Sequence, residues 1–194
     1  MSFRILGPYT RTVATAAVIA ATLIFSYTSL RVETWYAIQP LFEWMETTWF
    51  GVIGKTWGGA FATVPAGHLI GLAVLGGCVI ASDGRLLGLL LTDVPARTVV
   101  DRAYKVFFWA LMVTLATGIF MACGVAMKIY YLPVYWYKML ALVAGMLFEF
   151  FVRQPMLKGD IESLNPIAVK IVAISSIMIW FTVAATGRWI GFSG

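Results

Sequence analysis

The feature that most constrains this chain is a set of apolar stretches, each long enough to cross a lipid bilayer. About 20 helical residues, at about 1.5 Å rise per residue, cross the hydrocarbon core. Stretches of about that length recur along the whole sequence. The sequence therefore predicts an all-α, integral membrane bundle of about five transmembrane helices. Their predicted spans are residues 13–30, 61–82, 104–125, 135–152 and 167–186.

Composition agrees with a membrane protein and leaves no room for a second, soluble domain. Of the 194 residues, 61% are hydrophobic and 12% are charged, whereas soluble domains are about 45–50% apolar and about 25% charged. We therefore treat residues 1–194 as a single transmembrane domain with the lipid bilayer as its main partner. The formal net charge of +5 is interpreted as a signal of orientation rather than of nucleic-acid binding.

The segment between the first two spans is rich in tryptophan and carries acidic residues. Its apolar positions follow a helical spacing, and aromatic residues at this density suit the headgroup level. We expect an amphipathic helix at about residues 34–49, lying on the membrane.

Five spans put nine Lys and Arg residues, Arg4 among them, on the side of the N-terminus and five on the other side. The positive-inside rule then predicts a cytoplasmic N-terminus and a periplasmic C-terminus.

His68 is the single histidine, and it lies within the apolar span 61–82. An ionisable side chain at membrane depth is costly without a partner, so His68 is a candidate functional residue. The plainer alternative is a histidine bonded to the carbonyl of a neighbouring helix. In the predicted topology Lys138 and Arg188 lie near the same membrane face as His68.

These residues match the needs of a haem b, which are an axial ligand, cations for two propionates, and a groove for a flat ring. His68 would ligate iron, Gly71 and Gly76 would open the groove, and Lys138 and Arg188 would hold the propionates. Gly67 and Gly71 also form a G-x-x-x-G pair, which is typical of close helix packing. One histidine leaves the second axial position open to a water, to Lys138, to another subunit or to a methionine of the third span, namely Met112, Met121 or Met127.

Copper is the competing metal. Cu(I) prefers thiolate and thioether ligands together with imidazole, and Met121, Cys123 and Met127 could join His68. The two cysteines are expected to be apolar fillers rather than a disulfide.

At the other membrane face, Glu149 and Arg153 have an i, i+4 spacing and Asp83 and Arg85 lie at a similar level, which predicts a structural salt-bridge network.

Four segments give the chain a resemblance to known families. They read LFEWMETTWFG (41–51), GHLIGLAVLGGCVIASDGRLLGL (67–89), YWYKMLALVAGMLF (135–148) and AATGRWIGF (184–192). The chain resembles a domain-of-unknown-function family of small bacterial inner-membrane proteins over residues 41–194. It is more distantly similar to the copper-resistance protein D family and to HemJ-type protoporphyrinogen oxidase, a small membrane haem protein.

What the distant likeness implies is confined to His68 as a haem ligand and Lys138 near the haem or substrate. The chain departs from the family pattern at Gly84, where Asp-Leu-Arg is commoner, and at FEFFVR (148–153), where many relatives carry another histidine. The leading hypothesis is a haem b protein of the bacterial inner membrane, serving electron transfer or quinone-linked oxidoreduction. The alternatives are a copper-handling protein and a non-catalytic accessory subunit. A homo-oligomer or a larger membrane complex is compatible with each.

Overall fold

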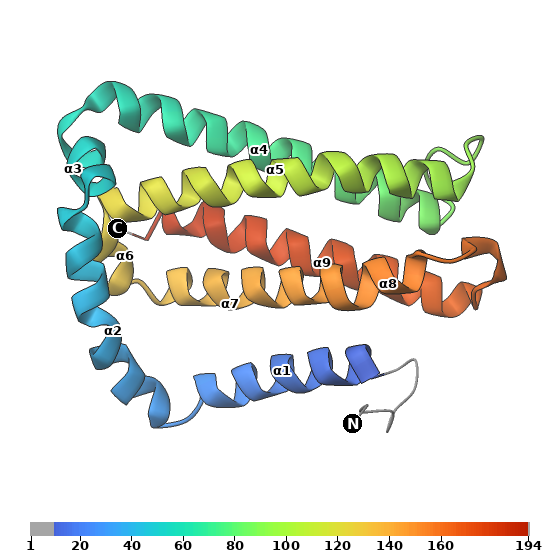
Figure 1. The fold of residues 1–194 in the computed structure, drawn as a ribbon, viewed down its shortest axis with the longest axis horizontal. Coiled ribbons are helices and arrows are strands. Elements are labelled where there is room, and N and C mark those ends of the chain that lie inside the picture. The colour runs from blue at the N-terminus through green and yellow to red at the C-terminus, as the bar shows by residue number, and fades with distance from the viewer. Residues whose placement is uncertain (1–9, 194) are drawn as a thin grey trace, which may run out of the picture.

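The computed structural model describes residues 10–193, which form a helical bundle without strands (Figure 1). Residues 1–9, and with them Arg4 of the charge count, lie outside the described part. The long helices are α4 (Gly58–Leu86), α5 (Ala96–Gly124), α7 (Pro133–Leu147) and α9 (Pro166–Ile190). The remaining elements are α1 (Thr10–Ser26), α2 (Leu30–Thr47), α3 (Trp49–Thr56), α6 (Ala126–Tyr130), a π-helical turn (Phe148–Arg153), α8 (Gln154–Leu157) and a 3₁₀ turn (Ile161–Ser163).

Four helical segments are long and apolar enough to cross a membrane, namely Gly58–Leu86, Ala96–Gly124, Pro133–Leu157 and Pro166–Ile190. Pro133 and Pro166 stand in the first turns of α7 and α9, where a missing N–H costs nothing. The prediction of an all-α membrane bundle is confirmed. The helix α5 begins at Ala96, eight residues before the predicted span 104–125, and its charged first turns contain an Arg97–Asp101 ion pair of 2.7 Å.

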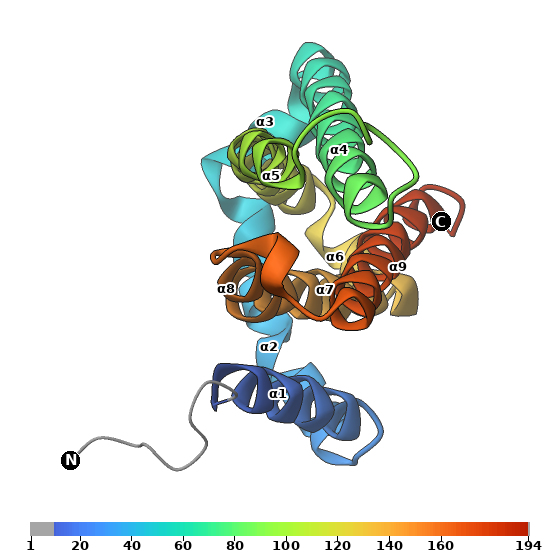
Figure 2. The same cartoon turned by 90° about the vertical axis from the view of Figure 1, so that its right-hand side faces the viewer.

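Most of the predicted first span, 13–30, forms helix α1, which ends at Ser26, whereas Leu30 already begins α2. The apolar stretch of α1, Ala16–Phe25, is shorter than those of the four long helices. Figure 2 shows α1 at the edge of the bundle, nearest to α7 and α8, and Ile19 and Leu23 line a shallow hollow with Leu140 of α7. α1 is thus a peripheral helix, and the four long helices make the core.

Helices α2 and α3, which we call the end cap, run across one end of the bundle (Figure 1). The predicted interfacial helix at 34–49 corresponds to α2, and a break at Thr48 separates it from α3. There the Thr48 hydroxyl accepts a hydrogen bond of 3.2 Å from the N–H of Gly51 and caps the new helix. The apolar face of α2 packs on α6 and α7 through Phe42, which is buried beside Tyr130 and Trp136.

A polar contact fastens the end cap to the α5–α6 junction. Glu46 accepts a hydrogen bond of 2.8 Å from the backbone N–H of Met127 and forms an ion pair with Lys55. The hydrogen bond from Lys55, followed by that from Met127, lowers the pKa of Glu46 below its ordinary value. A carboxyl with a lowered folded-state pKa stabilises the fold above its unfolded pKa, and this contribution is lost as pH falls through the folded value.

We therefore expect acid to loosen the end cap of the wild-type protein, and Glu46→Gln to remove this acid sensitivity. Hydrogen exchange of the α2 and α3 amides, measured from pH 7 down to about pH 3, a window that passes the ordinary Glu pKa, checks the expectation. Wild type should show faster exchange only at the acid end, and Glu46→Gln should be fast throughout. Glu43→Gln is the matched control, since Glu43 bonds only to Gln39 on the exposed side of α2. If amide exchange depended on acid equally in wild type and in Glu46→Gln, the contact of Glu46 would not hold the end cap in place.

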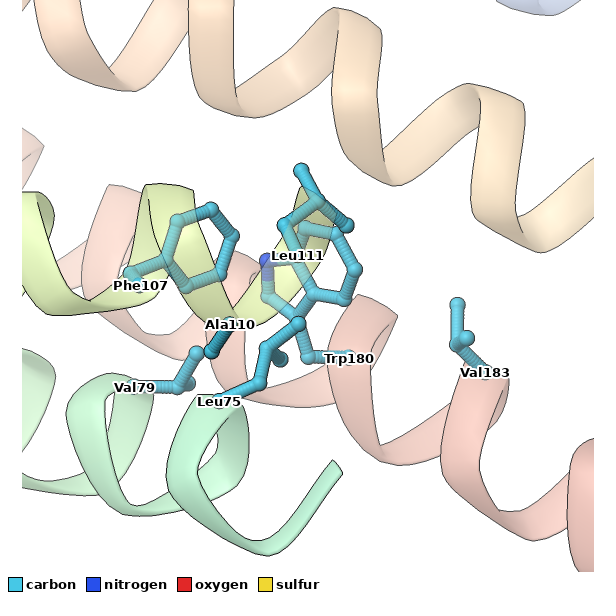
Figure 3. Packing of buried hydrophobic residues seen from close by; sticks show 7 residues of the cluster. All are labelled: Leu75, Val79, Phe107, Ala110, Leu111, Trp180 and Val183. Carbon is cyan, nitrogen blue, oxygen red and sulfur yellow. The ribbon is translucent and has the colours of Figure 1, made fainter. Parts of the chain in front are cut away.

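The main core lies where α4, α5 and α9 meet. Figure 3 shows Trp180 of α9 among side chains of α4 and α5, and its ring meets Phe107 edge-on at 5.1 Å. Leu75 and Leu111 complete the contact, and both are buried. This core joins three of the four long helices into one unit.

A buried ionic cluster joins α4 to the π-helical turn that follows α7, near the α4–α5 loop. Arg153, 3% exposed, donates to Asp83 at 2.7 and 3.0 Å and to Glu149 at 3.1 Å. The Ser82 hydroxyl accepts from the same guanidinium at 2.8 Å. The predicted salt-bridge network is present with Arg153 at its centre. Arg85 takes no part and donates to the carbonyl of Val94 at 2.7 Å.

Candidate functional site

A cavity of about 380 Å³ lies between the four long helices, on the side toward the end cap. Its wall is mostly apolar, and Met45 of α2 contributes from the end cap. Five residues with a polar side-chain nitrogen or oxygen line it: His68 of α4, Thr114 of α5, Tyr135 and Lys138 of α7, and Trp180 of α9. Cavities of this size, apolar with a few polar groups, are typical of small-molecule and cofactor sites.

The cavity exists because α4 and α9 diverge. Near the α4–α5 loop the two helices share the main core and lie close together, and toward α3 they separate (Figures 1 and 2). Lining residues at the edge of this gap are exposed on the outer surface of the bundle, among them Ile80 (51%) and Phe181 (73%). Since these apolar side chains lie on membrane-spanning helices, the cavity opens toward lipid.

His68 is 8% exposed, and its ring is held by Thr117 of α5, with 2.9 Å between Nδ1 and Oγ1. The Thr117 hydroxyl donates its single proton to the carbonyl of Val113 at 2.7 Å. We infer that its oxygen accepts from Nδ1–H and that Nε2 is the unprotonated ring nitrogen. A backbone hydrogen bond to Thr114 of α5 also holds the ring, and no side chain of the described residues bonds to Nε2. An imidazole oriented in this way through one nitrogen is prepared to coordinate through the other.

Two glycines make room for this arrangement. A Cβ at Gly118 would lie 3.3 Å from Cε1 of His68, and a Cβ at Gly71 would lie 2.7 Å from Oγ1 of Thr114. Gly118 thus leaves space for the imidazole, and Gly71 lets α4 approach α5. Gly71 does not line the cavity, so its place is the helix contact. Gly76 does line the cavity, and nothing lies within 4 Å of where its Cβ would be.

Lys138 lines the same cavity as His68. Its Nζ makes no hydrogen bond or ion pair with any described residue. Gly187 of α9 lies beside it, since a Cβ there would be 3.4 Å from Lys138 Nζ. The cavity therefore offers an unpaired amine and a free imidazole nitrogen to a ligand.

Arg188 lies outside the cavity wall. It is exposed at the end of α9, and its guanidinium carbon stacks 4.3 Å from the centre of the Phe192 ring. The structure thus brings His68, Gly76 and Lys138 together and leaves Arg188 at the neighbouring surface.

The proposed copper ligands lie elsewhere. Met121, Cys123 and Met127 do not line the cavity. Cys123 is buried near the end of α5, and Met127 packs in the cluster beneath the end cap. Among the described residues no group of three or more His, Cys, Asp or Glu side chains could hold a metal ion. The methionines that line the cavity are Met45 and Met139.

The tautomer of His68 is a direct test of this geometry. Because His68 is the only histidine, ¹⁵N-histidine labelling gives a single imidazole in the NMR spectrum. We expect wild type to carry its proton on Nδ1, and Thr117→Val, which removes the acceptor, to release this preference. Thr98→Val, a threonine of α5 outside this cavity, should leave the spectrum unchanged. A proton on Nε2 in wild type would contradict the assignment.

Comparison with known proteins gives one match. The model of a family described as "Family of unknown function (DUF6644)" matches residues 41–193, which include the four long helices and every residue of the cavity wall. No curated protein and no solved structure matches the chain.

Proposed function

Since the chain belongs to the DUF6644 family, whose function is unknown, we propose its function from the cavity: it binds haem b in the membrane, with His68 as an axial ligand. The observation that carries the proposal is the oriented imidazole, with Nδ1 held by Thr117 and Nε2 free, on the wall of an apolar cavity.

The residues of the cavity fit this group. A flat macrocycle needs apolar walls, an axial nitrogen and a cation for its carboxylates; the walls of α4, α5 and α9, His68 and Lys138 supply them. The cavity of about 380 Å³ is open between α4 and α9, so a ring edge can extend toward lipid. One cation lines the wall, and Arg188 at the adjacent surface is the candidate for a second propionate.

The chain's own residues define what such a site can do. Thr117 fixes the imidazole proton at Nδ1, and the apolar wall excludes water from the cavity. Lys138 presents a positive charge that favours an anionic group or added negative charge. Bound haem b supplies a one-electron carrier, and the surrounding residues tune it through ligand orientation, local charge and burial. This supports electron transfer or quinone-linked oxidoreduction at the membrane.

We favour haem over copper because the soft ligands Met121, Cys123 and Met127 do not line the cavity. We favour it over a purely accessory subunit because a packing role explains neither the cavity nor the unpaired Lys138. Within the proposal the protein resides in a bacterial inner membrane with a cytoplasmic N-terminus, alone, as a homo-oligomer or in a larger complex. The cavity then lies in the periplasmic half.

Titration of the detergent-purified protein with hemin tests the proposal. We expect saturable binding of one equivalent, and about tenfold weaker binding by Lys138→Met, which removes the cation, on the scale of one charge-assisted hydrogen bond. Lys170→Met is the control, since Lys170 is exposed at the start of α9, away from the cavity. Uptake that rises without saturation, as for hemin dissolving in micelles, would contradict a specific site.

A further inference from the structure

A groove runs along the outer junction of α4 and α5, separate from the haem cavity. It consists of two hollows, of about 420 and 590 Å³, that share Val74 and Val106. On α4 its wall extends from Gly67 to Ala81, which is about 21 Å at about 1.5 Å per residue. One leaflet of the hydrocarbon core is about 15 Å thick. The groove is therefore long enough to hold an acyl chain.

The floor of this α4–α5 groove has no side chain at two glycine positions of α4. Gly67 and Gly77 contribute no side chain, and nothing lies within 4 Å of where a Cβ at either position would be. The remaining wall is apolar apart from two cations and Thr98, and its Trp109 is 70% exposed. An apolar surface of this form in the membrane is filled by a hydrocarbon chain.

Two cations lie on the α5 wall of the groove, within the first ten residues of a helix that begins at Ala96 beside the α4–α5 loop. Arg102 lines one hollow and Lys105 the other. Neither forms an ion pair or hydrogen bond with another described residue. The acidic neighbour Asp101 is bound by Arg97 at 2.7 Å. Long cationic side chains near a helix end extend toward the headgroups, so both charges are available to an anionic group there.

We propose that the α4–α5 groove binds one anionic phospholipid from the leaflet at the loop end of the bundle. Its phosphate contacts Arg102 and Lys105, and an acyl chain lies along the groove over Gly77 and Val74. Basic hollows between membrane helices are known sites for anionic headgroups. The charge complementarity selects an anionic lipid over a zwitterionic one, and the apolar groove selects a lipid over a free phosphate.

Native mass spectrometry of the delipidated protein, titrated with phosphatidylglycerol or phosphatidylcholine, tests the site. At about fivefold in affinity for each cation near the surface, phosphatidylglycerol should bind roughly 30-fold more tightly than phosphatidylcholine. Arg102→Gln and Lys105→Gln should each reduce the preference about fivefold, and the double variant should abolish it. The control Lys170→Gln removes an exposed cation at the same end of the bundle, outside the groove, and should change nothing.

A second variant tests the acyl-chain part of the site. Gly77→Leu places a side chain in open space, so it fills the groove without disturbing the helix contact and should weaken binding of both lipids. Equal affinity for the two lipids, or a preference retained by the double variant, would overturn the proposal. So would full competition by glycerol phosphate, which would show headgroup binding without the groove.

Discussion

Replacing Arg153 with Met is expected to lower the free energy of unfolding by about 3–5 kcal/mol, the usual cost of removing one partner from a buried ion pair. Asp83 is 0% exposed and Glu149 is 2% exposed, and both are bound to Arg153. Without the guanidinium, two carboxyl groups remain buried in a low-dielectric environment without a counter-charge. Reversible unfolding in mixed micelles of detergent and dodecyl sulfate measures the loss.

Two comparisons separate charge from packing. Asp101→Asn breaks the exposed pair with Arg97 and should cost less than about 1 kcal/mol. The triple variant Asp83→Asn, Glu149→Gln, Arg153→Met removes all three charges and should recover part of the stability, because the buried carboxyl groups are then neutral. If Arg153→Met is as mild as Asp101→Asn, the cluster does not hold the helices together.

Replacing His68 with Ala is expected to eliminate specific haem binding, since the imidazole is the only His side chain of the chain and lies on the cavity wall. The protein should still insert and fold, because the main core of α4, α5 and α9 does not include His68. Absorption spectra of purified wild type and variant, at matched circular dichroism, give the comparison.

Thr117→Val is the matched variant, because it keeps the imidazole and removes the hydroxyl that holds Nδ1. Loss of such an outer partner typically weakens binding about 10–100-fold, so Thr117→Val should bind hemin weakly where His68→Ala does not bind it specifically. Haem bands of equal intensity in wild type and His68→Ala would exclude His68 as the ligand.

The helical membrane fold could be predicted from sequence because it depends on a local property, the length of each apolar stretch. The predicted span 104–125 marks the apolar part of α5, whereas the helix itself begins at Ala96, because hydropathy alone does not register its charged first turns with Arg97 and Asp101. Their i, i+4 pairing at 2.7 Å is the signal that the helix extends to Ala96. The break between α2 and α3 could not be predicted in the same way. It depends on one residue, Thr48, which caps α3, and the aromatic pattern of the sequence continues across it.

The site could be predicted only in part, since it depends on which helices meet. Lys138 shares the cavity with His68, as expected from their predicted depth, and Arg188 does not, because depth says nothing about the direction of a side chain. Thr117 and Gly118 were not predicted as site residues. The available signal was a polar residue followed by a glycine, Thr117-Gly118, within an apolar span. A single sequence does not show that this face of α5 packs against His68.

The most direct test of the central claim is a visible absorption spectrum of the detergent-purified wild-type protein, oxidised and then reduced with dithionite. The protein should be produced in cells with an adequate haem supply, and bound haem quantified against protein. The account predicts a Soret band, with α and β bands on reduction, at close to one haem per chain. A colourless protein that also fails to take up hemin would contradict it.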